Sequence, residues 1–486
     1  MSAAAAVLLV AIVAEDPAVL RNAPRDDAPA QASLWRGDWL EVRGETAGFL
    51  KVWDHRHERP GFVRPGIVRV HRLDAAAAPE LGAVVRFLRD SNGFESLGIG
   101  YAALFLRAAP AGMDTTEALA AIGGMADRLA RRASGRRTSA KDSTLAGHLE
   151  VAASYGVKFS AIDGDVGEGS ARLCYDGEAW EQVLATPGAA PIEKARAALW
   201  LAGTRCQPQL LAPAKERELW DRRLQALGGV DAAAVPAWLG GRVRLARAEA
   251  YAWRAFDRAR STDDGADVAS QAAAEAAIRE LALTDRGVLA PEDVLRRDDV
   301  AVRVGAVRFA AEPVTRDARK RAVAITTAPR APGETCVRVV PANDNGRAQP
   351  LAERCTYGVV WTNALRWSAS GTVATLAVQP MPAWTELWVV RKGDGVTTQW
   401  TIDTLAPATT DPNTDIGYVE SAGFSPDGAR LLVVRDARVA GRPTKKFQVL
   451  SASTLGVEIQ CGDVTKLSAF KRWQAAWWKA GTLALR

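Results

Sequence analysis

The chain has 486 residues, of which 48% are hydrophobic and 24% are charged. These fractions are ordinary for soluble globular proteins and exclude a chain that is disordered throughout. The length predicts about three domains, because a single core rarely grows beyond about 300 residues. The net charge of +6 is the difference between 62 basic and 56 acidic residues, which gives little support to a nucleic acid or another acidic polymer as the partner.

An uninterrupted apolar run of 12 residues extends from Ala3 to Ala14. It is too short to span a bilayer, which takes about 20 residues, so we expect no membrane span. The run suits the core of a signal peptide, with Ile12 and Ala14 at the positions that a signal peptidase reads. No basic residue precedes it, however, and residues 11–14 suit a first strand equally well. A start codon placed too far downstream would reconcile the two interpretations, and export is favoured.

Residues 11–73 consist of short strand-like segments broken by turns. Phe49–Asp54 and Gly61–Arg64 alternate with period two, which is the pattern of half-buried strands. Four or five strands in about 60 residues have to close on themselves to bury one face. The pattern therefore predicts a small β-barrel in this first domain.

Four segments of this region together resemble a bacterial SH3 domain: Val19–Pro24, Gly37–Asp38, Gly48–Val52 and Gly61–Val63. The family pattern is leucine-arginine before a small residue and proline, a glycine-aspartate turn, a tryptophan-x-x-valine-like strand and a closing glycine-tyrosine-valine. The third strand lacks the tryptophan often found there in the family. The resemblance implies an SH3-like barrel that binds a protein or a cell-wall polymer.

Residues 75–330 shift to a period near 3.6, which predicts a mostly helical domain. The expected amphipathic helices are 79–89, 114–133, 143–155, 191–203, 213–227 and 235–260. Residues 157–175 instead suit a hairpin. Arg247–Leu283 resembles one tetratricopeptide-type helical hairpin, although a single copy does not make a repeat array.

Residues 331–486 return to strand-like patterns and form the third expected domain. Leu365–Val378 and Ala422–Val434 resemble each other, and the second contains Phe424-Ser-Pro-Asp-Gly428. That motif is similar to the signature of propeller blades in Tol-system and WD-repeat proteins. The region has room for about three blades, fewer than the usual minimum of about four. We therefore expect a sandwich of blade-like sheets, within a multidomain α+β chain that resembles bacterial SH3 domain-containing proteins.

None of the five cysteines belongs to a C-x-x-C pair, which excludes zinc ribbons and thioredoxin-type redox motifs. Cys336 and Cys355 flank a turn-rich loop, so we expect a disulfide that closes a hairpin. Cys174 and Cys206 are a second candidate pair, and Cys461 is left over. Disulfides predict the periplasm or the cell envelope, and the alternative is a cytoplasmic protein with five reduced thiols.

Sixteen tryptophans outnumber the eleven phenylalanines, and many of them fall in the last third of the chain. An indole joins a large apolar face to one N–H, so it suits both sheet cores and ligand-binding surfaces. Packing inside the β-domain is the plainer interpretation. The candidate binding residues are Trp361, Trp367, Trp384 and Trp388.

A thiolate beside a histidine is the first catalytic pair to consider, because bacterial SH3 domains often accompany cell-wall cysteine peptidases. Cys174 lies in a strand and turn context, and the nearest histidine, His148, precedes it, which reverses the order of those peptidases. His55 and His57 could share one strand face and bind a metal, but their surroundings are typical of a solvated loop. We expect no catalytic residue, no metal and no cofactor.

Two further segments have plainer interpretations than the function they suggest. Gly98–Ala103 mimics a dinucleotide fingerprint, but no strand leads into it and no acidic residue follows at the required distance. We expect a loop with a helix start there. Residues 128–141 form the strongest basic run, and they lack the interleaved aromatic residues of a nucleic-acid surface.

The sequence thus predicts a non-catalytic binding or assembly protein of the cell envelope, with a protein or a wall polymer as its partner. The SH3-like domain or the four tryptophans would make the contacts. The alternative is a peptidoglycan hydrolase that its SH3-like domain directs to the wall. A cytosolic scaffold is a third hypothesis.

Overall fold

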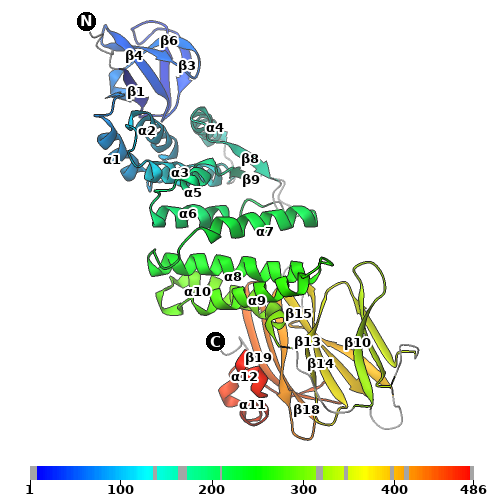
Figure 1. Ribbon diagram of the computed structural model, residues 1–486. Coiled ribbons are helices and arrows are strands. Elements are labelled where there is room, and N and C mark those ends of the chain that lie inside the picture. Colours follow the sequence, from blue (N-terminus) through cyan, green and yellow to red (C-terminus); the bar gives the residue numbers. More distant parts are fainter. Residues whose placement is uncertain are drawn as a thin grey trace. The chain divides into compact units, whose positions relative to one another are not determined.

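A computed structural model describes residues 8–134, 139–162, 172–207, 211–313, 321–343, 349–393, 399–409 and 415–481. The chain divides into two compact units (Figure 1). The N-terminal unit comprises residues up to 214 together with 225–235, and the C-terminal unit comprises 215–224 and the residues from 236 onward. The boundary falls inside the stretch 75–330. Among the described helices, none is long and apolar enough to cross a membrane.

The N-terminal unit begins with a seven-stranded antiparallel sheet in the order β3-β2-β6-β5-β4-β1-β7. The strands are β1 Leu9–Val13, β2 Ala18–Arg21, β3 Ala30–Leu34, β4 Trp39–Thr46, β5 Phe49–Asp54, β6 Arg59–Val63 and β7 Val68–Arg72. Alternate apolar side chains such as Leu20, Leu40 and Val52 form its core. The apolar run of the sequence therefore ends in a buried strand, and its residues 3–7 lie outside the described part of the chain.

Helices and one hairpin pack beside this sheet. They are α1 Ala78–Leu88, α2 Glu95–Ala108, α3 Thr116–Ala133, α4 Ser139–Ser154, β8 Phe159–Ile162, β9 Arg172–Tyr175, α5 Glu178–Ala185 and α6 Pro191–Leu201. The expected hairpin is confirmed by the antiparallel pairing of β8 and β9. In the basic run, Arg131 and Arg132 form ion pairs with Asp127 and Glu95, and residues 135–138 lie outside the described residues.

The expectation of a loop at Gly98–Ala103 is wrong, because this segment lies inside α2 and is largely buried. Its glycines serve close packing. A Cβ at Gly100 would stand 2.6 Å from the carbonyl oxygen of Gly37 in the neighbouring turn. Glycine is a poor helix former in isolation, so packing against the sheet overrides the local preference here.

The C-terminal unit contains three long helices, α8 Ala237–Ala259, α9 Ala266–Ala282 and α10 Pro291–Val307, together with part of α7 Pro213–Gly228. The expected helical hairpin is present as α8 and α9. Small side chains line their contact, including Ala248, Ala252, Ala274 and Ala277. Short side chains allow two helix backbones to approach closely, and α10 completes this layer.

The β-rich part of the C-terminal unit has a three-stranded and an eight-stranded sheet. The first consists of β10 Val323–Pro329, β11 Thr335–Pro341 and β12 Ala352–Thr356. The second contains β13 Val359–Trp367, β14 Val373–Met381, β15 Trp384–Lys392, β16 Trp400–Leu405, β17 Ile416–Phe424, β18 Arg430–Val439, β19 Arg442–Ser451 and β20 Val457–Cys461. Figure 1 shows several of these strands side by side in yellow and orange.

The eight-stranded sheet consists of two antiparallel meanders, β13 to β16 and β17 to β20, joined by a short parallel pairing of β15 with β17. The two similar sequence stretches occupy equivalent positions, because each turn connects the first two strands of its meander. Gly371 and Gly428 hold positive φ angles of 71° and 73° in these turns, a conformation that glycine adopts without steric cost. The repeated motif therefore marks a repeated hairpin.

Two disulfides join Cys174 to Cys206 and Cys336 to Cys355, in agreement with the two expected pairs. Cys336 and Cys355 lie directly opposite each other on β11 and β12. Cys461 is a free thiol. Stable disulfides form in oxidising compartments, so the two bridges indicate an extracytoplasmic location.

Replacing Cys336 and Cys355 together by serine should lower the free energy of unfolding by about 3 kcal/mol, because the bridge restricts a loop of about 20 residues in the unfolded chain. Urea titration followed by tryptophan fluorescence measures this. Cys461→Ser is the matched control and should change stability little. Five titratable thiols in the folded native protein would contradict the pairing.

Candidate functional site

A hollow with a volume of about 920 Å³ lies in the C-terminal unit. We call it the tryptophan cleft. One wall is the start of β10, the floor is the end of β13 and the turn after β17, and the other wall is the C-terminal segment. Its lining residues are Arg321, Val323, Ala324, Ile325, Ala342, Leu365, Arg366, Trp367, Ala369, Gly423, Phe424, Ser425, Pro426, Trp473, Ala475 and Trp477. The volume lies within the range of about 300–1,000 Å³ typical of ligand pockets.

The C-terminal segment reaches the cleft because it docks directly on β17. Ala475 donates its backbone N–H to the carbonyl oxygen of Ala422 at 2.9 Å. Gly423 has a φ of 137°, and a Cβ there would stand 2.6 Å from the carbonyl oxygen of Trp473. Trp478 of α12 Ala476–Gly481 is fully buried against Phe470 of α11 Ser468–Trp473. This anchoring places Trp473 and Trp477 on the cleft wall.

The cleft is aromatic and cationic. The Arg321 guanidinium lies 4.6 Å from the ring centroid of Trp367, and that of Arg366 lies 4.9 Å from the ring of Trp477. Such cation–π contacts hold both partners in place. Among the described residues that line the cleft, none is acidic. Glu312 balances the charge of Arg366, so an anionic ligand with a planar or apolar body would match the Arg321 side of the cleft and its aromatic surface.

A buried chain of ion pairs fixes Arg366 from behind. Its Nη2 lies 2.6 Å from Glu312 Oε2, and the other oxygen of Glu312 lies 2.8 Å from Arg308 Nη1. Arg308 also pairs with Glu420 on β17. Burial would lower the pKa of Arg308, but Glu420 and Glu312 outweigh it, so this pKa is raised above its ordinary value. Burial lowers the pKa of Arg366, yet a guanidinium stays protonated in proteins.

The four tryptophans named from the sequence fall into two groups. Trp367 is half-buried and lines the cleft. Trp361, Trp384 and Trp388 are only 6%, 2% and 3% exposed and pack within the sheets. The plainer interpretation as core residues therefore describes these three, because a ligand cannot reach them in this arrangement.

Sequence reasoning missed Trp473 and Trp477. The signal was present, since three tryptophans occur within six residues at 473–478. Their exposure depends on Gly423, which lets the segment lie against β17 with one indole buried and two facing the cleft. That packing could not be read from local composition.

A second pocket, of about 420 Å³, lies in the N-terminal unit between the sheet and the ends of α2 and α4. Trp39 and His55 stack with ring centroids 5.0 Å apart, and the Arg107 guanidinium lies 5.0 Å from the ring of Trp39. Tyr155 donates its hydroxyl to the carbonyl oxygen of Gly37. The pocket thus combines an aromatic stack with basic groups.

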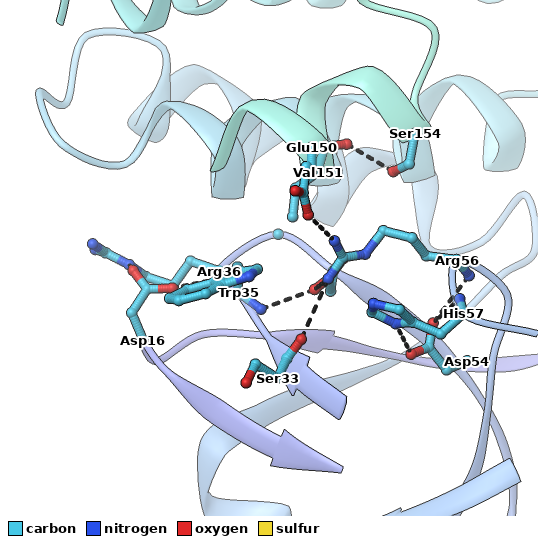
Figure 2. Close-up of polar contacts among 12 residues, drawn as sticks. Asp16, Ser33, Trp35, Arg36, Asp54, Arg56, His57, Glu150, Val151 and Ser154 are labelled. Carbon is cyan, nitrogen blue, oxygen red and sulfur yellow. Dashed lines mark hydrogen bonds and ion pairs between the residues drawn. The ribbon is translucent and has the colours of Figure 1, made fainter. Parts of the chain in front are cut away.

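Arg56 connects the sheet to α4 at the base of this pocket (Figure 2). Its guanidinium donates to Glu150 at 3.1 Å and to Asp38 at 2.7 Å. Asp38 is buried, and this burial raises its pKa to about 6, although Arg56 and the backbone N–H of Trp35 lower it. Figure 2 also shows His57 beside Asp54, with its Nδ1 at 2.5 Å from Oδ2.

The other candidate catalytic and metal-binding residues do not come together. His55 contacts Glu41, and His148 is buried against Asp16 with its Nε2 at 2.8 Å from Oδ2. Cys174 is bound to Cys206. The group of potential metal ligands found within the described ranges is Cys336, Glu353 and Cys355, and its two thiols are joined in a disulfide.

No protein-family model, no curated protein and no solved structure matches this chain. The residues of the two cavities and the two disulfides are therefore the features that indicate a function.

Asp38 should make the stability of the N-terminal unit depend on pH. Its pKa in the folded state, about 6, exceeds that of an unfolded aspartate, so its contribution is present below about pH 4 and is lost as the pH rises through about 6. Relative to the native chain, Asp38→Asn should gain up to about 3 kcal/mol between pH 4 and 7.5. Urea titrations at several pH values measure this difference.

Asp27→Asn, at a side chain that is 80% exposed, is the control and should not show this change. A constant difference between the native chain and Asp38→Asn over the whole pH range would contradict the assignment.

Proposed function

We propose that this chain is a non-catalytic binding or assembly protein of the bacterial cell envelope, and that the tryptophan cleft holds its partner. The observation that carries the proposal is the lining of the cleft. Trp367, Trp473 and Trp477 offer apolar faces, Arg321 carries positive charge, and the described part of the lining contains no acidic residue. Aromatic and arginine side chains dominate the energetics of binding surfaces.

The location follows from the disulfides. Bridges at 174–206 and 336–355 suit a compartment that oxidises thiols. We propose the periplasm, which is also the compartment that the apolar run near the N-terminus favours. A partner in this compartment is either an envelope protein or a polymer of the wall.

The N-terminal sheet supports a second contact surface. Its antiparallel strands carry the leucine-arginine, glycine-aspartate and closing glycine-x-valine segments that resemble a bacterial SH3 domain. We propose an SH3-like barrel for this region. The pocket beside it, with Trp39, His55 and Arg107, is a candidate for a second, smaller ligand group.

The alternative of peptidoglycan hydrolysis depended on Cys174 and His148. The Cys174 sulfur is consumed in a disulfide, and a thiolate is what such catalysis requires. The His148 ring is buried against Asp16. These two residues therefore give the hydrolase hypothesis no support.

The test is site-specific photocrosslinking in the native host, with a photoreactive phenylalanine analogue in place of Trp473. A discrete adduct with one envelope component is expected. The same analogue at position 238 is the matched control, because Trp238 is 38% exposed but does not line the cleft. It should give no such adduct.

Binding of the captured component to the purified protein should weaken about tenfold or more in Trp473→Ala, since a buried aromatic contact contributes more than about 1 kcal/mol. Trp238→Ala should bind as the native protein does. Equal adducts from both positions, or undiminished binding by Trp473→Ala, would contradict the proposed function.

A further inference from the structure

The wall of the tryptophan cleft includes an edge strand. In the three-stranded sheet the order is β10-β11-β12, so β10 pairs on one side only among the described strands. An unpaired strand edge presents backbone N–H and C=O groups at which another chain can add. Such addition at the cleft requires that some backbone groups of β10 point away from β11 and that they border the cleft.

The hydrogen-bond register shows which backbone groups of β10 point away from β11. Ala342 donates its N–H to the carbonyl oxygen of Ala322 at 2.9 Å, and Arg330 donates to Glu334 at 3.2 Å. On the β10 side, these two hydrogen bonds involve Ala322 and Arg330, which flank the strand and are both even-numbered. They fit the register that pairs Val323 with Pro341. In an antiparallel pair, every second residue directs its backbone groups away from the partner strand. The odd-numbered residues, Val323, Ile325 and Thr327, therefore direct theirs outward.

The residues that line the cleft include part of β10. Val323, Ala324 and Ile325 all line it, next to Arg321, and Val323 is 6% exposed. The cleft thus brings together an edge that is unpaired among the described strands, the Arg321 guanidinium and the half-buried indoles of Trp473 and Trp477. Successive side chains of an added strand would point to opposite sides, so one set could reach Arg321 and the other the tryptophans.

We propose that the tryptophan cleft binds an extended acidic peptide segment that also carries apolar or aromatic side chains, added as a strand to the outer edge of β10. The inference rests on the proposed function and names the chemistry of the partner. Carboxylates match the paired donors of a guanidinium. A wall glycan would contact the tryptophans, but it lacks the regular backbone amides of a strand. The free edge therefore favours a peptide.

The test begins with a phage-displayed library of random dodecapeptides, selected on the full-length oxidised protein. Enriched peptides should combine acidic with apolar or aromatic residues. A synthetic peptide of the consensus should bind about tenfold or more weakly to Arg321→Gln and to Trp473→Ala. Trp238→Ala is the control and should bind it normally. Near-UV circular dichroism shows whether each variant keeps the native fold.

Strand addition makes a second prediction, which nonspecific binding of an acidic peptide would not fulfil. N-methylation of the bound peptide should weaken binding about tenfold or more at alternate residues and have little effect at the residues between them. Equal tolerance at every position would overturn strand addition. A basic consensus, no enrichment, or binding unaffected by both cleft variants would overturn the proposal.

Purified peptidoglycan, used as a second probe, distinguishes failure of the peptide inference from failure of the proposed function. If peptidoglycan binds and Trp473→Ala abolishes that binding while no peptide binds, the cleft is a binding site and the peptide inference is wrong. If neither probe nor any envelope component binds, both proposals are wrong.

Discussion

Four charged side chains buried between the helices and the sheet hold the C-terminal unit together. Glu420, Arg308, Glu312 and Arg366 form a continuous chain of ion pairs. Arg308 and Glu312 lie at and just beyond the end of α10, whereas Glu420 belongs to one meander and Arg366 to the other. Removing one member would leave an uncompensated buried charge, which costs about 3–5 kcal/mol. These ion pairs therefore fix both meanders against the same helix.

The geometry of the cleft depends on this arrangement. Arg366 can lie over the ring of Trp477 because Glu312 and the carbonyl oxygens of Asn363 and Leu365 accept its N–H groups. Opposite, Gly423 lets the C-terminal segment approach β17 without a clash. Tight packing on one side and fixed charge on the other keep the cleft open and preorganised, which reduces the entropy lost on binding.

Local patterns were sufficient for much of this architecture. Alternation predicts strands in the N-terminal sheet, and the 3.6-residue period predicts α1, α3, α4, α6, α7 and α8 but not α2, α5 or α10. Each pattern follows directly from which face is buried. The Cys336–Cys355 pair follows from the hairpin that it closes. The repeat of the Ser425–Gly428 turn at Ser368–Gly371 correctly marks two equivalent hairpins, although it does not give the number of sheets.

The remaining features depend on contacts between segments far apart in the sequence. Gly98 and Gly100 weaken the local helix signal, yet Met125 and Gly37 require their small size. The burial of Trp384 and the exposure of Trp473 are set by which element covers each indole, and neither residue type nor spacing encodes that. The cleft could therefore not be located from the sequence, even though one of its tryptophans was among the candidates.

Hydrogen–deuterium exchange of the full chain, with and without a solubilised envelope fraction, tests most directly whether the tryptophan cleft is the binding site. We predict slower amide hydrogen exchange in residues 321–325 and 473–477 when the partner is present, because the bound partner would cover both walls of the cleft. Protection confined to the N-terminal sheet, with these two segments unchanged, would contradict it.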